Sequence, residues 1–113
     1  MSEQQIQAAC VKWLWNNHPE TRGLFFAVNN NSEHIARAMN RKAVGVVPGV
    51  SDTVFLWSGQ TYLIEFKTTK GRQSDVQKIW EETVKKRGFR YYIVRSEIEF
   101  RELIESIIKT PGN

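Results

Sequence analysis

Glu65 and Lys67 are the two residues of this sequence whose types and spacing most directly offer chemistry. They flank Phe66 in the stretch "YLIEFK", whose aromatic and branched residues predict a β-strand. Side chains alternate between the two faces of a strand, so the acid and the amine share one face. The carboxylate can bind a cation, and the ammonium can stabilise developing negative charge. The alternative is a solvated ion pair on an exposed face, and a second acid beside them would argue against it.

Asp52 is predicted to be that second acid, because a hairpin brings it opposite Glu65. The segments 52–57 and 61–67 read as strands, and Ser58-Gly59 fits the two-residue turn between them. This register gives the other face of the hairpin a continuous apolar layer, formed by Phe55, Tyr62, Ile64 and Phe66. A register shifted by one residue would send the two carboxylates to opposite faces. The hydrophobic pattern therefore favours the register that joins them.

Two carboxylates placed directly opposite each other repel unless a positive charge lies between them. A hard divalent cation such as Mg²⁺ suits carboxylate oxygens, and it can polarise a phosphate and activate a bound water. Lys67 could then orient that water or neutralise charge on the phosphate. Zinc is not expected, because one cysteine and two histidines form no Cys–His cluster. Asp52 could equally be a turn residue that follows Pro48-Gly49.

The elements that must position these residues can be read from caps and apolar periodicity. Ser2 with Gln5, and Ser74 with Gln77, match the S-x-x-Q capping box that opens a helix. Helices are expected over 2–17, 74–87 and from 96 onward, with a shorter one after Ser32, and further strands over 24–28 and 89–94. An apolar stripe marks the helix over 74–87, formed by Val76, Ile79, Trp80 and Val84. The order α-β-(α)-β-β-α-β-α predicts an α/β fold, a small mixed β-sheet flanked by helices.

Composition narrows the class of protein. The 113 residues fit one domain, expected over 1–109, with 110–113 as a frayed tail. The net charge of +4 is a modest indication of a polyanionic partner. The single cysteine favours a reducing compartment, and neither a secretory signal nor a membrane-length apolar run is present. A cytoplasmic protein is therefore expected.

The motifs together resemble a known group of enzymes. "VPGVSD", twelve residues, "EFK" and then "SDVQKIW" resemble the PD-(D/E)XK nuclease superfamily, and more narrowly the VRR-NUC family of virus-type replication-repair nucleases. The resemblance implies a restriction-endonuclease-like core that uses Mg²⁺ or Mn²⁺. It implies that Asp52, Glu65 and the backbone carbonyl of Phe66 bind the metal, and that Lys67 is catalytic. Ser51 departs from the pattern, since it stands where the superfamily name has proline.

Two outer positions also match the family. Gln77 matches a catalytic-site glutamine on the helix after the E-x-K strand, although its place in a capping box gives it a structural role as well. Glu3 matches an acidic residue of the first helix that joins the metal site in some members. An acid in a first helical turn is also favoured by the helix dipole alone, so both interpretations stay open.

The expected substrate is DNA, contacted through its phosphates by cations near the motif. The candidates are Lys70, Arg72, Lys78, Arg37, Arg41 and Lys42. The resemblance implies a structure-specific endonuclease that resolves four-way (Holliday) junctions as a homodimer, in a bacterial or phage-infected cell. The alternatives are a flap or single-strand DNA nuclease, and a catalytically idle DNA-binding module.

Overall fold

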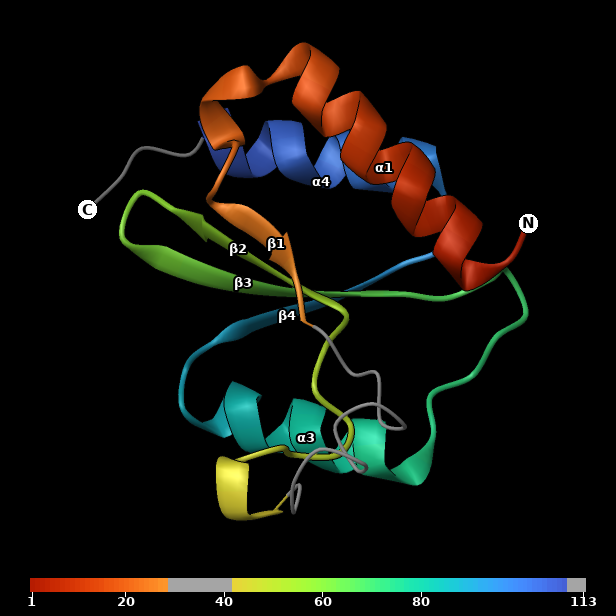
Figure 1. Cartoon of the computed structure of the whole chain (residues 1–113), viewed down its shortest axis with the longest axis vertical. Helices are drawn as coiled ribbons and strands as arrows, with labels where there is room; N and C mark the ends of the chain where they lie inside the picture. Colours follow the sequence, from red (N-terminus) through yellow and green to blue (C-terminus); the bar gives the residue numbers. More distant parts are fainter. Residues whose placement is uncertain (29–41, 110–113) are drawn as a thin grey trace.

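A four-stranded mixed sheet forms the centre of the computed structural model, which describes residues 1–28 and 42–109 (Figure 1). The strands lie in the order β1 (Phe25–Ala27), β2 (Thr53–Trp57), β3 (Gln60–Phe66) and β4 (Arg90–Val94). Helices α1 (Glu3–Asn17) and α4 (Glu97–Lys109) lie on one side of the sheet, and α3 (Asp75–Lys86) lies on the other. Two short 3₁₀ helices, Pro19–Thr21 and Lys42–Val44, complete the described elements. The expected α/β fold, a small mixed sheet flanked by helices, is confirmed.

The helix caps predicted from the sequence are present. The Ser2 hydroxyl accepts a hydrogen bond from the Gln5 N–H, and the Gln5 side chain accepts one from the Ser2 N–H. Ser74 and Gln77 form the same reciprocal pair at the start of α3. Each box satisfies donors that the first helical turn would otherwise leave unpaired. None of the described helices is long and apolar enough to cross a membrane.

The hairpin adopts the predicted register. Its pairs include Val54 with Leu63 and Leu56 with Thr61. Ser58 and Gly59 have φ angles of 50° and 78°, the two positive values that a tight twisted hairpin turn requires. The ladder of β2 begins at Thr53, so Asp52 lies just ahead of it, while Glu65 lies within β3. This register sets which side chains face the core.

The core lies between the sheet and the α1–α4 pair. The predicted apolar layer of the hairpin is buried there against both helices; its members and their main partners are Phe55, Tyr62, Ile64, Phe66, Cys10, Leu14, Phe100 and Ile104. Since side chains alternate along β3, packing Ile64 and Phe66 into this core turns Glu65 toward the other face. The core thus determines where the acid points.

Helix α3 connects two parallel neighbours, as the sequence predicts, because Phe66 of β3 pairs with Val94 of β4. Its apolar stripe is not buried, however. Val76 is 45% exposed and Ile79 is 62% exposed, and no residue of α3 is fully buried. The shorter helix expected after Ser32 lies outside the described residues.

Candidate active site

Asp52 reaches across the end of the hairpin to the neighbouring strand. Its Oδ2 accepts a hydrogen bond of 2.7 Å from the Phe66 N–H, which fixes the carboxylate at the carboxyl end of β3. Burial raises the pKa of Asp52, and the negative charge of Glu3 acts in the same direction. The Phe66 N–H and the positive charge of Lys67 act against that rise. Asp52 is therefore a positioned carboxylate with a penalty for being ionised.

Glu65 is the most unusual polar residue of the structure. It is fully buried, with 0% of its surface exposed, and neither carboxylate oxygen has a hydrogen-bond partner among the described residues. Burial raises the pKa of Glu65, and the charge of Asp52 raises it further. The two carboxylates therefore lie within electrostatic reach of each other, as the hairpin register predicts. Buried polar groups are almost always paired, so an unpaired carboxylate calls for a functional explanation.

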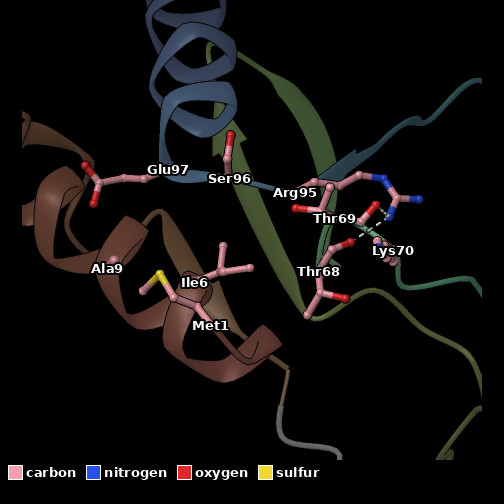
Figure 2. A pocket seen from close by; sticks show the side chains of 9 residues that line it. All are labelled: Met1, Ile6, Ala9, Thr68, Thr69, Lys70, Arg95, Ser96 and Glu97. Carbon is pink, nitrogen blue, oxygen red and sulfur yellow. Dashed lines mark hydrogen bonds between the residues drawn. The ribbon is translucent and has the colours of Figure 1, made fainter.

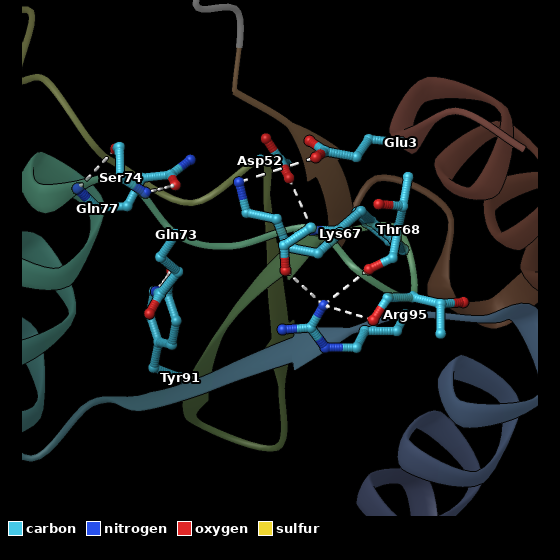
Figure 3. Close-up of polar contacts among 12 residues, drawn as sticks. Glu3, Asp52, Lys67, Thr68, Gln73, Ser74, Gln77, Tyr91 and Arg95 are labelled. Carbon is cyan, nitrogen blue, oxygen red and sulfur yellow. Dashed lines mark hydrogen bonds and ion pairs between the residues drawn. The ribbon is translucent and has the colours of Figure 1, made fainter.

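Lys67 brings the positive charge to this cluster. Only 6% of its surface is exposed, and its Nζ lies 3.9 Å from Oε2 of Glu3 (Figure 3). Its backbone N–H donates to the Val94 carbonyl at 3.0 Å, which holds the residue in line with β4. Figure 3 shows the Lys67, Asp52 and Glu3 side chains converging. An ammonium group buried beside acids is poised to stabilise a negative charge.

Glu3 joins the cluster from α1. It occupies the first turn after the Ser2 cap, where the helix dipole favours an acid, and it also pairs with Lys67. Both interpretations of this position therefore have support. The Glu3 side chain is 45% exposed, so it forms the open rim of the site rather than its floor.

Two residues that the sequence did not single out complete the surroundings of Glu65. Gln73 Nε2 donates to Oε1 of Glu81 at 2.9 Å and to the Tyr91 hydroxyl at 3.2 Å. Tyr91 is buried on β4, and burial together with the charge of Glu65 raises the pKa of the Tyr91 hydroxyl. Because Tyr91 accepts from Gln73, its own O–H remains available to donate toward Glu65. Both groups help to hold the pKa of Glu65 down, although neither forms a hydrogen bond of good geometry with it.

The signal for Tyr91 was present in the alternation along β4. Tyr92 stacks on Tyr62 on the core side of the sheet, and Tyr91 packs edge-on against Trp80 of α3 on the other side. Adjacent residues of a strand face opposite ways, so one of the two tyrosines had to share the face of Glu65. The register between β3 and β4 decides which one.

The remaining residues predicted from the sequence are a capping glutamine and a set of candidate DNA contacts. The Gln77 Oε1 accepts from the Ser74 N–H at 2.8 Å, so its capping role is present. Lys70, Arg72 and Lys78 are exposed, the first two on the loop after β3 and the third on α3. The side chains of the other three predicted DNA contacts, Arg37, Arg41 and Lys42, lie outside the described residues.

The motif turn before Asp52 packs against α3. A Cβ on Gly49 would lie 2.3 Å from the Val76 carbonyl oxygen, and the φ of Gly49 is +83°. Any side chain there would collide with main-chain atoms that cannot move cheaply. Glycine at this position therefore lets the segment leading to Asp52 approach the first turn of α3.

The residues fit a hard cation by donor type. Glu65 offers two buried oxygens that no described residue satisfies, and Asp52 offers a second carboxylate near them. Over residues 1–28 and 42–109, no group of three Asp, Glu, His or Cys side chains is gathered closely enough to enclose a metal. The predicted ligand set does not require a third acid, since Mg²⁺ typically binds through one or two carboxylates and keeps several waters.

Fold and site together define an α/β domain with a buried acid–acid–lysine cluster. The family profile of the VRR-NUC domain matches residues 1–97, and the chain belongs to this family. A solved structure described as a VRR_NUC domain protein has a TM-score of 0.78 to this chain at 16% identity, and the match covers 99% of this chain and 92% of the other. A comparison with curated proteins gave no match. The family implies a nuclease-type function with DNA as substrate, and its nucleases generally use divalent metals.

Proposed function

We propose that residues 1–109 form a single PD-(D/E)XK nuclease domain that cleaves DNA with Mg²⁺ or Mn²⁺. One observation carries this proposal: the Glu65 carboxylate is fully buried and has no hydrogen-bond partner within residues 1–28 and 42–109, while the charge of Asp52 acts on it. Such an arrangement destabilises the fold of the metal-free chain. A divalent cation relieves that penalty, because it satisfies both acids at once.

The roles follow from the donors. Asp52, Glu65 and the Phe66 carbonyl would hold the cation, and Glu3 would join them from the rim. The bound ion would polarise the phosphate and lower the pKa of a bound water. Lys67 stabilises negative charge on the phosphate oxygens, because its buried ammonium is poorly screened by solvent. The Asp52–Phe66 hydrogen bond keeps the carboxylate in place before substrate arrives.

DNA is held through its phosphates. Lys70, Arg72 and Lys78 are exposed near the carboxyl end of β3 and along α3, and Arg37, Arg41 and Lys42 extend the proposed contact set. In Gln77 the amide oxygen is engaged by Ser74, which leaves its NH₂ group as the donor for a phosphate. These groups recognise the backbone, so the enzyme responds to the shape of DNA more than to its sequence.

The favoured substrate is a four-way junction, cut by a homodimer in the cytoplasm. A two-fold pair of chains would present two active sites, one for each strand of a symmetric junction. This part of the proposal rests on the resemblance to stand-alone members of the family. A flap or single-strand nuclease and a catalytically idle DNA-binding module are the competing outcomes of the test below.

The test compares labelled four-way junctions, flaps, duplexes and single strands in Mg²⁺, Mn²⁺ and EDTA. Glu65→Ala and Lys67→Ala should each lower the cleavage rate by about 100-fold or more. Lys12→Ala, which removes one exposed charge from α1, is the matched control and should cleave like the wild type. Cleavage confined to flaps or single strands would replace the junction assignment. Equal behaviour of the wild type and both site variants would leave an idle module.

Two further measurements separate the parts of the proposal. A calorimetric Mn²⁺ titration should show binding by the wild type and at least tenfold weaker binding by Asp52→Ala. Sedimentation of the protein with an uncut junction in Ca²⁺ should give the mass of two chains per junction. One chain per junction would refute the homodimer but would not bear on the proposed cleavage chemistry.

A further inference from the structure

A pocket of about 530 Å³ opens between α1, the loop after β3 and the start of α4 (Figure 2). Its walls come from three places: the start of the chain with Ile6 and Ala9 of α1, the loop 68–70 after β3, and residues 95–97 where β4 passes into α4. No role in the proposed cleavage chemistry uses this space.

The pocket adjoins the reacting groups along the chain. Thr68, in its wall, directly follows Lys67. Glu3, which pairs with Lys67, lies one helical turn before Ile6 on α1. The pocket and the acid–acid–lysine cluster are therefore built on the same two segments, the first turns of α1 and the chain from Lys67 into the following loop.

One wall of the pocket is fixed in place by Arg95. Its Nη1 donates to the carbonyl oxygens of Thr68 and Gly71, both at 2.7 Å, and lies 3.5 Å from that of Thr69. A loop without regular secondary structure would otherwise leave these carbonyls to water. The pocket is therefore formed before any ligand arrives, which reduces the entropy lost on binding.

The lining combines an apolar surface with a positive charge. Ile6, Ala9 and the Met1 side chain form the apolar part, and Lys70 supplies an ammonium. Among the described residues, no acid forms an ion pair with Lys70. The one acid of the wall, Glu97, is paired with Arg101 on α4, so its charge is largely compensated. A ligand with a flat apolar part and an anionic group fits this lining.

We propose that the pocket receives one unpaired nucleotide of the DNA substrate, next to the phosphodiester that is cleaved. This inference rests on the proposed nuclease function and names the feature of DNA that the site selects. The base packs on Ile6 and Ala9, and its phosphate lies against Lys70. A pocket of this volume is large enough for a nucleotide. Extruding a paired base costs unstacking energy that an unpaired base does not, so junction points and single-stranded ends are favoured over continuous duplex.

The first experiment detects the nucleotide alone. Amide chemical shifts of the full chain, in EDTA, are followed during titration with thymidine 5′-monophosphate, thymidine and inorganic phosphate. The monophosphate should give saturable shifts at residues 68–70 and 95–97, with thymidine and phosphate each at least tenfold weaker. Equal binding of inorganic phosphate would reduce the pocket to an anion site and overturn the proposal. The absence of shifts at these amides would do the same.

The second experiment fills the pocket and uses a neighbouring alanine as control. Ala9→Phe places a ring in the pocket, whereas Ala8→Phe places it on the exposed side of the same helix. The wild type and Ala8→Phe should bind DNA with one unpaired nucleotide about tenfold more tightly than the matched duplex. Ala9→Phe should bind both alike. Thr69→Trp, on the exposed loop, gives an independent way to fill the pocket if Ala9→Phe does not fold. An undiminished preference in the folded variants would refute the assignment.

Metal-dependent cleavage by the wild type separates this inference from the proposed function. If the enzyme cuts DNA but the monophosphate does not bind, the pocket assignment fails and the nuclease assignment stands. If the monophosphate binds but no DNA is cut with Mg²⁺ or Mn²⁺, the nuclease assignment fails, and the pocket remains a nucleotide-binding site without a cleaved phosphodiester beside it.

Discussion

Replacing Glu65 with glutamine should make the metal-free protein more stable, although the substitution removes a proposed catalytic group. The carboxylate is fully buried and both of its oxygens lack partners in the part of the chain that the structure describes, so the native state carries the penalty of an uncompensated polar group. A neutral amide of the same shape removes the charge from that penalty. The gain should be about 1–3 kcal/mol, which corresponds to roughly 4–12 °C in Tm for a domain of this size.

The stability gained by Glu65→Gln should increase with pH over a defined window. Burial raises the pKa of Glu65 above its ordinary value of 4.5, so the folded state holds this proton more tightly than the unfolded state does. The wild type therefore loses stability as pH rises from that ordinary value through the raised folded pKa. Glutamine does not titrate, so the stability difference between variant and wild type should grow across this window and stay constant above it.

Added metal should make the wild type more stable than Glu65→Gln. At a metal concentration of about 100 times Kd, binding stabilises the native wild type by about 2.7 kcal/mol, and Glu65→Gln should gain far less. Thermal unfolding in EDTA and in Mn²⁺ measures both terms. Glu102→Gln, an exposed change on α4, controls for the loss of one charge and should leave Tm nearly unchanged in both buffers. A variant that is less stable than the wild type in EDTA, or one that keeps the full metal shift, would refute the reasoning.

Three further experiments, two with substitutions and one with a thiol reagent, test other parts of the structure. Gly49→Ala and Gly45→Ala both place alanine at a positive φ, +83° and +84°, but only the Cβ at position 49 meets main-chain atoms of α3. Gly49→Ala should therefore lose about 1–3 kcal/mol more stability than Gly45→Ala in denaturant unfolding. Equal losses would contradict the close contact. Tyr91→Phe should weaken Mn²⁺ binding about tenfold by calorimetry, whereas Tyr92→Phe, on the core side, should not; equal effects would remove the orienting role of the hydroxyl. Burial raises the pKa of the Cys10 thiol to about 12, so it should react with a disulfide reagent at mildly alkaline pH only after unfolding, and rapid labelling of the native protein would contradict its burial.

The hairpin shows what a sequence can determine by itself. A two-residue turn and a run of alternating apolar residues leave one register that buries Phe55, Ile64 and Phe66 together, and the structure has that register. The same alternation put Glu65 on the face of Lys67. The caps were equally accessible, because Ser2 and Ser74 act on groups only three residues away.

The contacts that depend on long-range register were not accessible. No local turn fixes how β4 lies beside β3, so the pairing that sets Tyr91 near Glu65 could not be derived from the sequence. Gln73 was missed for the same reason, since its two partners come from α3 and β4. The stripe of α3 predicted an amphipathic helix correctly, but periodicity alone does not say how deeply residues such as Ile79 are covered.

Arg95 shows that a positive charge close in sequence to the candidate site need not serve to bind DNA. Its guanidinium is occupied by main-chain oxygens of the loop that follows Lys67, so it works as an internal cross-link between the end of β4 and that loop. Both carbonyl oxygens accept from one guanidinium nitrogen, Nη1, which carries two hydrogens and can satisfy both. A count of basic residues would assign Arg95 to substrate binding, whereas its bonds assign it to the architecture that keeps Lys67 and Lys70 in their places.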